Sequence, residues 1–321
     1  MALTPLDPAK QRRHKLRNRL HTWLLTGGSI ALLAFCAMSI WGWPGLLSAA
    51  IAGGIGLWTA TRISPAMVLR MYRAHPLQPD AFPDGHRVIE ALSQRAGLPI
   101  TPKLYYVPSK MMNAFAVGTP GDSAIAVTDG LVRGLTLRQF AGVIAHEMSH
   151  IRNEDIKVMA LGDVVTRMTS FLSTLGVLTL LFHLTDFIQG GVSLWIAILL
   201  LLAAPTVGGL LQLALSRARE YDADLDAAGL TGDPEGLASA LVMLERTQRG
   251  VWEGLILPGS RLPEPSLLRS HPRTQDRVER LLSLRPEPEP YVVYSEEHPE
   301  IGNSIARVTR RPRVRMPGIW Y

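Results

Sequence analysis

The stretch TLRQFAGVIAHEMSHI, residues 136–151, determines how the rest of the chain is interpreted. It opens with threonine followed three residues later by glutamine, the capping-box pattern that starts a helix. In that helix His146 and His150 are four residues apart and therefore share one face. Two imidazoles on one face can bind one tetrahedral metal ion, and Glu147 is placed to contact a metal-bound water. The pattern predicts a metal-dependent hydrolase.

A pair of surface histidines on an amphipathic helix is the alternative explanation of this motif. An HExxH match arises by chance in about one chain in a hundred of this length, so the motif alone is not decisive. The surrounding run AGVIAHEMSHI, residues 141–151, is otherwise apolar. A His–Glu–His group buried there needs a polar or metal partner, which disfavours the surface alternative.

The third metal ligand has to come from a later segment. Asn153 and Ile156 stand where a metzincin carries glycine and histidine. The segment SRAREYDAD, residues 216–224, places Glu220 and Asp224 four residues apart on one helical face. Such a pair can supply one ligand and one carboxylate that supports a ligand histidine. A solvated, charged helix explains the same spacing, so the spacing alone leaves Glu220 undecided.

Composition points to a membrane protein. The chain has 321 residues, of which only 19% are charged, and its mean hydropathy is +0.14. These values argue against intrinsic disorder and against a purely soluble globule. The single cysteine, Cys36, excludes an intramolecular disulfide, a CxxC redox pair and a zinc ribbon. The net charge of +6 does not indicate nucleic-acid binding, because membrane orientation and anionic headgroups explain the basic residues beside the apolar stretches.

Residues 23–61 are predicted to form a transmembrane hairpin. Apolar stretches at 23–41 and 46–60 flank a short uncharged turn, and each approaches the ~20 residues that a spanning helix needs. A basic arm, residues 1–22, precedes them and Arg62 follows, so the positive-inside rule places both ends in the cytoplasm. A cleaved signal peptide is the rival for the first stretch. No A-x-A site precedes a polar segment there, which disfavours it.

A second apolar hairpin is predicted at about 168–215. Its stretches, 168–184 and 192–215, are joined by a loop without Lys or Arg, and basic residues lie on both outer sides. The alternative is a buried hairpin of a soluble protein, because the first stretch is rich in Ser and Thr. With four spans, residues 62–285 form one cytoplasmic domain that the second hairpin interrupts. Residues 286–321 form a Pro-rich charged tail.

Three segments are predicted to be strands: residues 103–107, 114–117 and 123–127. Together with the helices they make the fold class α+β, mostly helical with a small β-sheet.

The two motif blocks, HEMSHIRNED and SRAREYDADLDAA, resemble those of the HtpX-type membrane zinc metallopeptidases, which are relatives of the CAAX prenyl endopeptidases. The family pairs HExxHxxNxD with SRxxExxAD after two membrane spans, and both blocks occur here in that order. The resemblance covers most of residues 20–285. It implies a gluzincin metallopeptidase domain with a small β-sheet, plus about four transmembrane helices in two hairpins. Four spans rather than seven speak against a CAAX prenyl endopeptidase with an enclosed chamber.

The resemblance also implies roles for individual residues. His146, His150 and Glu220 would bind one Zn²⁺ per chain, and Glu147 would act as general base in the attack of zinc-bound water. Asp224 matches the carboxylate that supports a ligand. Manganese or cobalt would fit the same ligand set.

Two further residues match family elements. Asn113 precedes a strand that could pair with an extended substrate, where it would orient the substrate; an asparagine in a strand-entry turn is the alternative. His271, in Ser270-His271-Pro272, would stabilise the oxyanion; a helix-capping histidine is the alternative.

These observations predict a zinc endopeptidase of the bacterial inner membrane, multi-pass, with its active site facing the cytoplasm. The resemblance implies that its substrates are misfolded or unassembled membrane proteins, and that it serves protein quality control under stress. The alternative is a catalytically silent membrane scaffold of the same fold that binds partner proteins. The scaffold is disfavoured because His146, Glu147, His150 and Glu220 are all present. A transporter is disfavoured because no track of ionised residues crosses the spans.

Overall fold

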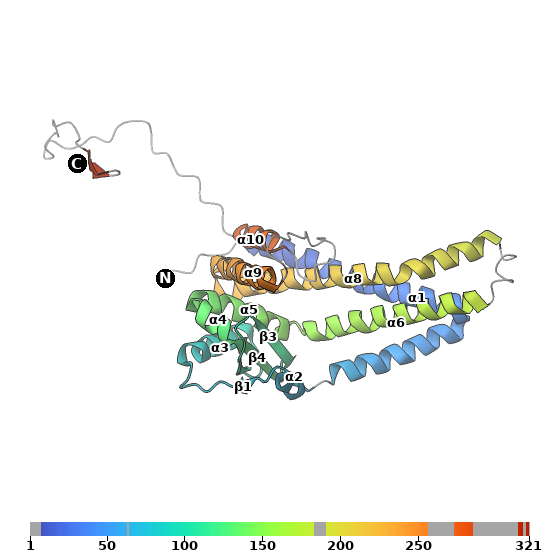
Figure 1. The fold of residues 1–321 in the computed structure, drawn as a ribbon, viewed down its shortest axis with the longest axis horizontal. Helices are drawn as coiled ribbons and strands as arrows, with labels where there is room; N and C mark the ends of the chain where they lie inside the picture. Colours follow the sequence, from blue (N-terminus) through green and yellow to red (C-terminus); the bar gives the residue numbers. More distant parts are fainter. Residues whose placement is uncertain are drawn as a thin grey trace. The chain divides into compact units, whose positions relative to one another are not determined.

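The computed structural model describes residues 8–62, 64–182, 191–255, 273–284, 314–316 and 319–320. The chain divides into two compact units, Met1–Pro286 and Glu287–Tyr321. In the second unit, β5 (Val314–Met316) pairs antiparallel with β6 (Ile319–Trp320). The first unit holds the long helices, a four-stranded sheet and the motif helix (Figure 1).

Helix α1 (Pro8–Thr61) is a hairpin of two arms. At Gly42 the backbone leaves the helical region, with φ 63° and ψ −143°, a conformation that glycine adopts without steric penalty. The arms then run in opposite directions (Figure 1). The reversal falls in the turn predicted between residues 41 and 46. Residues 8–22, predicted as a basic arm, are helical and form the leading turns of α1.

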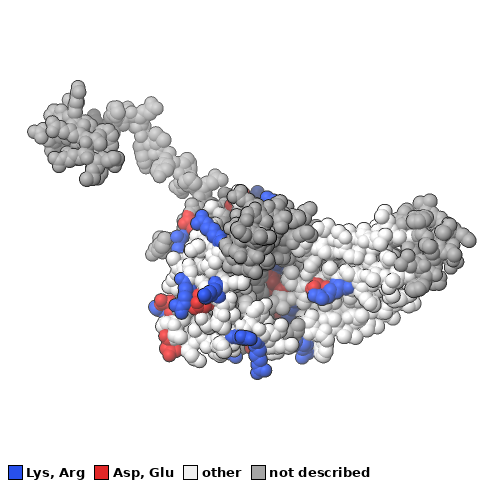
Figure 2. All heavy atoms as spheres, viewed as in Figure 1, with Lys and Arg blue, Asp and Glu red and all other residues white. Residues whose placement is uncertain are grey.

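Helices α6 (Asp155–Phe182) and α8 (Gly191–Thr231) pack against α1 around a small apolar cluster that includes Cys36 and Ala204. Several Ser and Thr residues of α6 donate to backbone carbonyls of the helices, and Ser173 Oγ donates to the carbonyl of Leu201 on α8, at 2.5 Å. On the face shown in Figure 2, the part of the long helices that lies away from the sheet is largely free of charged side chains, whereas charged side chains gather over the rest of this unit.

Within the described ranges, two helices are long and apolar enough to cross a membrane: Gln11–Thr61, which holds the hairpin, and Ile198–Thr231. The expected four spans therefore remain a prediction. Helix α8 continues without a break from its apolar part through Glu220, so the metal-ligand candidate lies on the same helix as the apolar stretch before it.

The sheet has the order β1-β2-β4-β3 and is mixed. Strands β1 (His75–Pro76) and β3 (Ala114–Thr119) are the edges, β2 (Lys103–Val107) is parallel to β4 (Asp122–Thr128), and β3 is antiparallel to β4. The predicted strands at 103–107, 114–117 and 123–127 are confirmed. Strand β3 pairs only with β4 in the described chain, so its second edge faces the motif helix.

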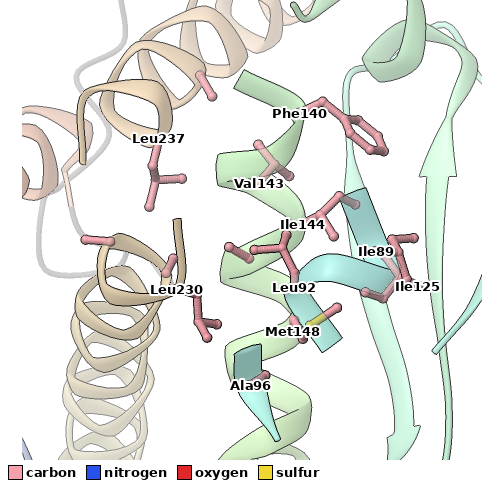
Figure 3. Packing of buried hydrophobic residues seen from close by; sticks show 14 of the residues in the cluster. Ile89, Leu92, Ala96, Ile125, Phe140, Val143, Ile144, Met148, Leu230 and Leu237 are labelled. Carbon is pink, nitrogen blue, oxygen red and sulfur yellow. The ribbon is translucent and has the colours of Figure 1, made fainter. Parts of the chain in front are cut away.

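The motif helix α5 (Leu137–Arg152) lies in the centre of the main core, between α3 (Pro83–Ala96) and the sheet on one side and α8 and α9 (Pro234–Leu255) on the other (Figure 3). Gly142 permits the closest approach, because a Cβ there would meet the backbone nitrogen of Leu237 at 2.8 Å. The remaining helices are α2 (Pro65–Met71), α4 (Asp129–Gly134) and α10 (Thr274–Leu282). The core holds α5 rigidly and so fixes the direction of its polar side chains.

Candidate metal centre

Helix α5 begins as the sequence predicts. Thr136 Oγ1 accepts from the backbone N–H of Gln139, and the Gln139 side chain accepts from the backbone N–H of Thr136. From this fixed start, the apolar positions of α5 face the core and His146 and His150 face α8. The two imidazole rings meet edge to face, with centroids 4.7 Å apart.

The structure brings Glu220 of α8 to the histidine pair of α5. The two Nε2 atoms lie 3.2 Å apart, Glu220 Oε2 lies 3.5 Å from His146 Nε2, and Glu220 Oε1 lies 3.9 Å from His150 Nε2. Ligand atoms at ~2.0–2.1 Å from a tetrahedral zinc ion are separated by about 3.4 Å. The three side chains therefore have the spacing of a metal site, and no other group of this kind occurs in the described ranges.

Each histidine is oriented by a carboxylate on its other nitrogen. His146 Nδ1 lies 3.0 Å from Asp224 Oδ1, and His150 Nδ1 lies 2.7 Å from Asp155 Oδ2. A histidine that donates from Nδ1 carries a lone pair on Nε2, which is the arrangement that binds metals. Two such lone pairs 3.2 Å apart repel each other unless a cation lies between them. The donor set therefore fits a metal ion.

The electrostatics of His146 agree with this conclusion. Burial lowers the pKa of His146, but hydrogen bonds to Asp224 and Glu220 outweigh burial and raise the pKa to about 10. The site thus favours positive charge at the imidazole, supplied either by a proton or by a metal ion.

Two buried arginines compensate the carboxylates. Arg277 of α10 donates to both oxygens of Asp224, at 2.7 and 2.6 Å, and its third nitrogen lies 3.2 Å from Glu220 Oε2. Arg219 Nε donates to Asp155 Oδ1 at 2.6 Å, and Arg219 also contacts Asp222 at 2.8 Å. Burial alone would raise the pKa of Asp224, but the charge and hydrogen bonds of Arg277 hold that pKa below its usual value.

Glu147 lies between the metal centre and the edge strand. Its Oε2 accepts a hydrogen bond from the backbone N–H of Ala116 on β3, at 3.0 Å. Burial raises the pKa of Glu147, which brings it toward the range in which a carboxylate accepts a proton near neutral pH.

The backbone of β3 offers a free edge beside Glu147. Thr128 donates from its backbone N–H to the carbonyl of Asn113 at 3.0 Å. This bond fixes which residues of β3 direct their backbone groups toward β4, because bonded and non-bonded residues alternate along an antiparallel strand. Asn113, Phe115 and Val117 bond to β4, while the backbone groups of Ala114 and Ala116 point away from β4. The Asn113 side chain is exposed and makes no hydrogen bond to the described part of the chain.

The structure thus gathers most of the predicted site residues. His146, Glu147, His150, Glu220 and Asp224 lie together, and Asn113 lies at the entry of the edge strand. His271 lies outside the described residues. Asp155 is the last residue of the HExxHxxNxD block and Arg277 fits the family's HP-x(4)-R element, but the sequence did not show their contacts with His150 and Asp224, and it indicated no role for Arg219. The spacing of Asp155, five residues after His150 at the end of a helix, is the signal that could have indicated its contact with His150.

Comparison with known proteins finds a peptidase family and relatives named as proteases, which agrees with the metal-site geometry. The model of Peptidase family M48 matches residues 79–285. The chain is similar to a protein named Protease HtpX homolog from Acaryochloris marina, with 36% identity over 282 residues covering 83% of this chain and 94% of that protein. It is similar to Protease HtpX from Legionella pneumophila, with 31% identity over 280 residues covering 83% and 99%. A homolog from Thermococcus sibiricus is 35% identical over 288 residues, covering 83% and 97%.

Among solved structures, the chain is similar to that of S. mikatae Ste24p. The TM-score is 0.50 at 20% identity, and the match covers 87% of this chain and 67% of that one. At this identity the likeness concerns the fold.

Proposed function

Because the chain belongs to Peptidase family M48 and is a metalloprotease, we propose that it uses one Zn²⁺, held by His146, His150 and Glu220, to hydrolyse peptide bonds within polypeptides. The observation that carries this proposal is the triangle of ligand atoms, in which both histidines are oriented from behind by carboxylates. When bound, the metal would lower the pKa of a coordinated water and polarise the scissile carbonyl.

Glu147 is the general base in this proposal. Its burial raises its pKa, so the carboxylate can take a proton from water and pass it to the leaving amine. The hydrogen bond from Ala116 N–H to Oε2 holds the carboxylate against β3. The base is therefore fixed relative to the strand along which a substrate would lie.

The free edge of β3 binds the substrate in this proposal. The backbone groups of Ala114 and the carbonyl of Ala116, which point away from β4, can pair with an extended peptide, while the Ala116 N–H stays on Glu147. Such backbone pairing gives affinity with little sequence preference. Asn113, exposed at the strand entry, can donate or accept one further bond to that peptide. His271 is retained as the candidate oxyanion donor.

Two of the described helices are long and apolar enough to cross a membrane, and the chain matches a relative named Protease HtpX over 99% of that relative's length. Both observations support a membrane location in this proposal. Trp23 and Trp58 are exposed near the outer ends of the two apolar stretches of α1, and Trp41 and Trp43 are exposed at the reversal. Aromatic residues gather in this way at the two faces of a bilayer. We place the chain in the bacterial inner membrane with four spans and the metal centre in the cytoplasm. Misfolded or unassembled membrane proteins are the substrates in this proposal, and stress-related quality control is the role.

The test compares the wild-type chain with Glu147→Gln, both purified in detergent, stripped with chelator and reloaded with zinc. Cleavage of casein and self-cleavage are measured together with bound zinc. The expected result is that both proteins bind one zinc ion per chain and only the wild type cleaves. Glu90→Gln, which changes an exposed glutamate of α3, is the matched control and should cleave normally.

Two outcomes would contradict the proposal. Cleavage by Glu147→Gln at the wild-type rate would remove Glu147 from the chemistry. Zinc binding without cleavage in either protein would favour the scaffold that binds partner proteins. Reloading with manganese or cobalt in parallel identifies the metal that supports turnover.

A further inference from the structure

The leading turns of α1, residues 8–22, contact the half of α8 that carries Glu220. Lys15 Nζ lies 2.8 Å from Asp226 Oδ1. One turn later, Asn18 Nδ2 donates to Asp222 Oδ1 at 3.4 Å. Asn18, Asp222 and Asp226 are all buried. This is a packed polar interface, which differs from a basic arm that only contacts lipid headgroups.

The interface has a regular register. Gln11 approaches Gly229, since a Cβ there would meet Gln11 Nε2 at 2.8 Å. Steps of three or four residues forward along α1 lead from Gln11 to Lys15 to Asn18. Their partners on α8 are Gly229, Asp226 and Asp222, which follow one another in steps of three or four residues backward. Farther along, a Cβ at Gly208 would contact Leu32 at 3.8 Å, in the same register. The first arm of α1 and α8 are therefore one antiparallel pair, whose polar end lies at the metal centre (Figure 1).

The two acidic residues of this interface also reach the motif helix. Asp226 Oδ2 accepts from Asn153 Nδ2 at 2.8 Å, and Asn153 is the C-cap of α5. Asp222 Oδ2 accepts from Arg219, which holds Asp155 behind His150. Contacts from Lys15 and Asn18 therefore continue to both helices that carry the proposed metal ligands.

Helix α10 is part of the same arrangement. Arg280 donates to Asn18 Oδ1 at 3.4 Å, and its guanidinium carbon lies 3.9 Å from the centre of the Tyr221 ring. Three residues earlier on α10 is Arg277, which binds Asp224 and Glu220. Asn18 thus contacts α8 through its amide nitrogen and α10 through its amide oxygen.

Charge balance makes Lys15 the residue on which this interface depends most. Asp155, Asp222 and Asp226 are buried together, and Arg219 contacts the first two. Lys15 supplies the cation for Asp226. Removing it leaves a buried carboxylate without a charged partner, and such a carboxylate strongly destabilises the arrangement around it.

We infer that the leading turns of α1 are part of the scaffold of the metal centre, with Lys15 and Asn18 as positioning residues that fix α8 against α5 and thereby set the spacing between Glu220 and the histidine pair. The inference rests on the proposed function, in that it takes His146, His150 and Glu220 as the metal ligands. It adds a role for a segment that the sequence assigns only to membrane orientation.

The test measures zinc affinity by competition with a chromophoric chelator, using the full chain in detergent. Lys15→Met is compared with Arg13→Met, which removes the same charge from an exposed position two residues earlier. We expect Lys15→Met to weaken zinc binding about tenfold, because groups that support metal ligands have effects of 10–100-fold. Arg13→Met should stay within twofold of the wild type, and Lys15→Arg should restore most of the affinity.

Melting temperatures with excess chelator and with excess zinc separate positioning from a merely structural role. Positioning predicts a smaller zinc-induced rise in melting temperature for Lys15→Met. A structural role alone lowers both temperatures equally and leaves the zinc affinity unchanged, which would overturn the inference. Equal effects of Lys15→Met and Arg13→Met would also overturn it, since headgroup contact would then explain both.

Two provisions keep the test decisive. If Lys15→Met does not fold, Lys15→Gln, which can still donate to Asp226, replaces it and should weaken zinc binding to a smaller degree; wild-type affinity in this variant would contradict the inference. The wild type itself separates the two proposals. Failure of the wild type to bind zinc refutes the proposed function. If the wild type and the Lys15 variants all bind zinc and cleave equally well, only the positioning role is refuted and the proposed function stands.

Discussion

Replacing Asp224 by asparagine tests how much the carboxylate behind His146 contributes to metal binding. In Asp224→Asn the side chain keeps its shape and loses its charge. Asp224 now accepts one bond from His146 Nδ1 at 3.0 Å and two from Arg277 at 2.7 and 2.6 Å. An amide oxygen in place of Oδ1 can still accept from His146 Nδ1 and from Arg277 Nη2, but the NH₂ group in place of Oδ2 would face Arg277 Nε, which is also a donor.

The size of the effect follows from these contacts. Loss of a group that supports a ligand histidine weakens metal binding by about 10–100-fold. Because the amide leaves the buried Arg277 Nε without an acceptor and removes the negative charge behind His146, we expect a value near the upper end, about 100-fold or 2.7 kcal/mol. The metal-free protein should also lose about 3 kcal/mol, the lower end of the range for breaking a buried ion pair, since Arg277 keeps its contact with Glu220 at 3.2 Å.

The assay is chelator competition for zinc, with thermal melting in chelator as the stability measurement. Asp84→Asn is the matched control, because Asp84 also pairs with an arginine, Arg87, but on the surface of α3. It should leave zinc affinity unchanged. Wild-type zinc affinity in Asp224→Asn would refute the reasoning, since the carboxylate behind His146 would then not support a metal ligand.

Three further predictions concern acid stability, the α1 reversal and the edge strand. The pKa of Asp224 is lower in the folded protein than in the unfolded chain, so its charge contributes stability above the unfolded pKa, near pH 4, and that stability is lost as pH falls through the folded pKa. The melting temperature of the metal-free protein should therefore fall less on acidification in Asp224→Asn than in the wild type. Gly42→Ala should lower the melting temperature by the equivalent of about 1–2 kcal/mol, because φ is 63°, whereas Gly54→Ala, at an open helical position, should not; equal melting temperatures would contradict the hairpin. Ala116→Pro removes the N–H that binds Glu147 and no bond to β4, so kcat should fall while zinc affinity is retained; unchanged kcat would remove that hydrogen bond from the mechanism.

Local signals explain what the sequence could predict of the fold. The capping box at Thr136 and Gln139 is complete within four residues, and it appears in the structure as expected. The reversal at Gly42 follows from an uncharged turn between two apolar stretches. The strands follow from short runs of β-branched, aromatic and apolar residues bounded by turns. Each of these depends on neighbours in the chain.

The boundary of α8 shows where that reasoning stops. The change from apolar to charged residues after Leu215 suggests the end of the predicted second hairpin. In the structure, one helix runs through the change, because nothing in that segment breaks a helix. A change of environment is visible in the sequence, but continuity of the backbone across it is not.

The residues of the site, too, were predictable from the sequence only in part. The pair His146 and His150, and the pair Glu220 and Asp224, are visible as spacings of four on a helix face. The contacts of Lys15 with Asp226 and of Arg277 with Asp224 join segments far apart in the chain, and no periodicity marks them. They exist because buried carboxylates require partners, which only the folded arrangement identifies.

The position of Glu220 after the apolar part of α8 has a consequence for biosynthesis. The histidine pair and Glu147 leave the ribosome first, before α6 and α8 have been made. At about 5–20 residues per second, the nascent chain carries an incomplete ligand set for on the order of 4–14 s before Glu220 emerges, and Arg277 follows later still. With the proposed ligand set, the order of translation thus withholds peptidase activity until both long helices have been made.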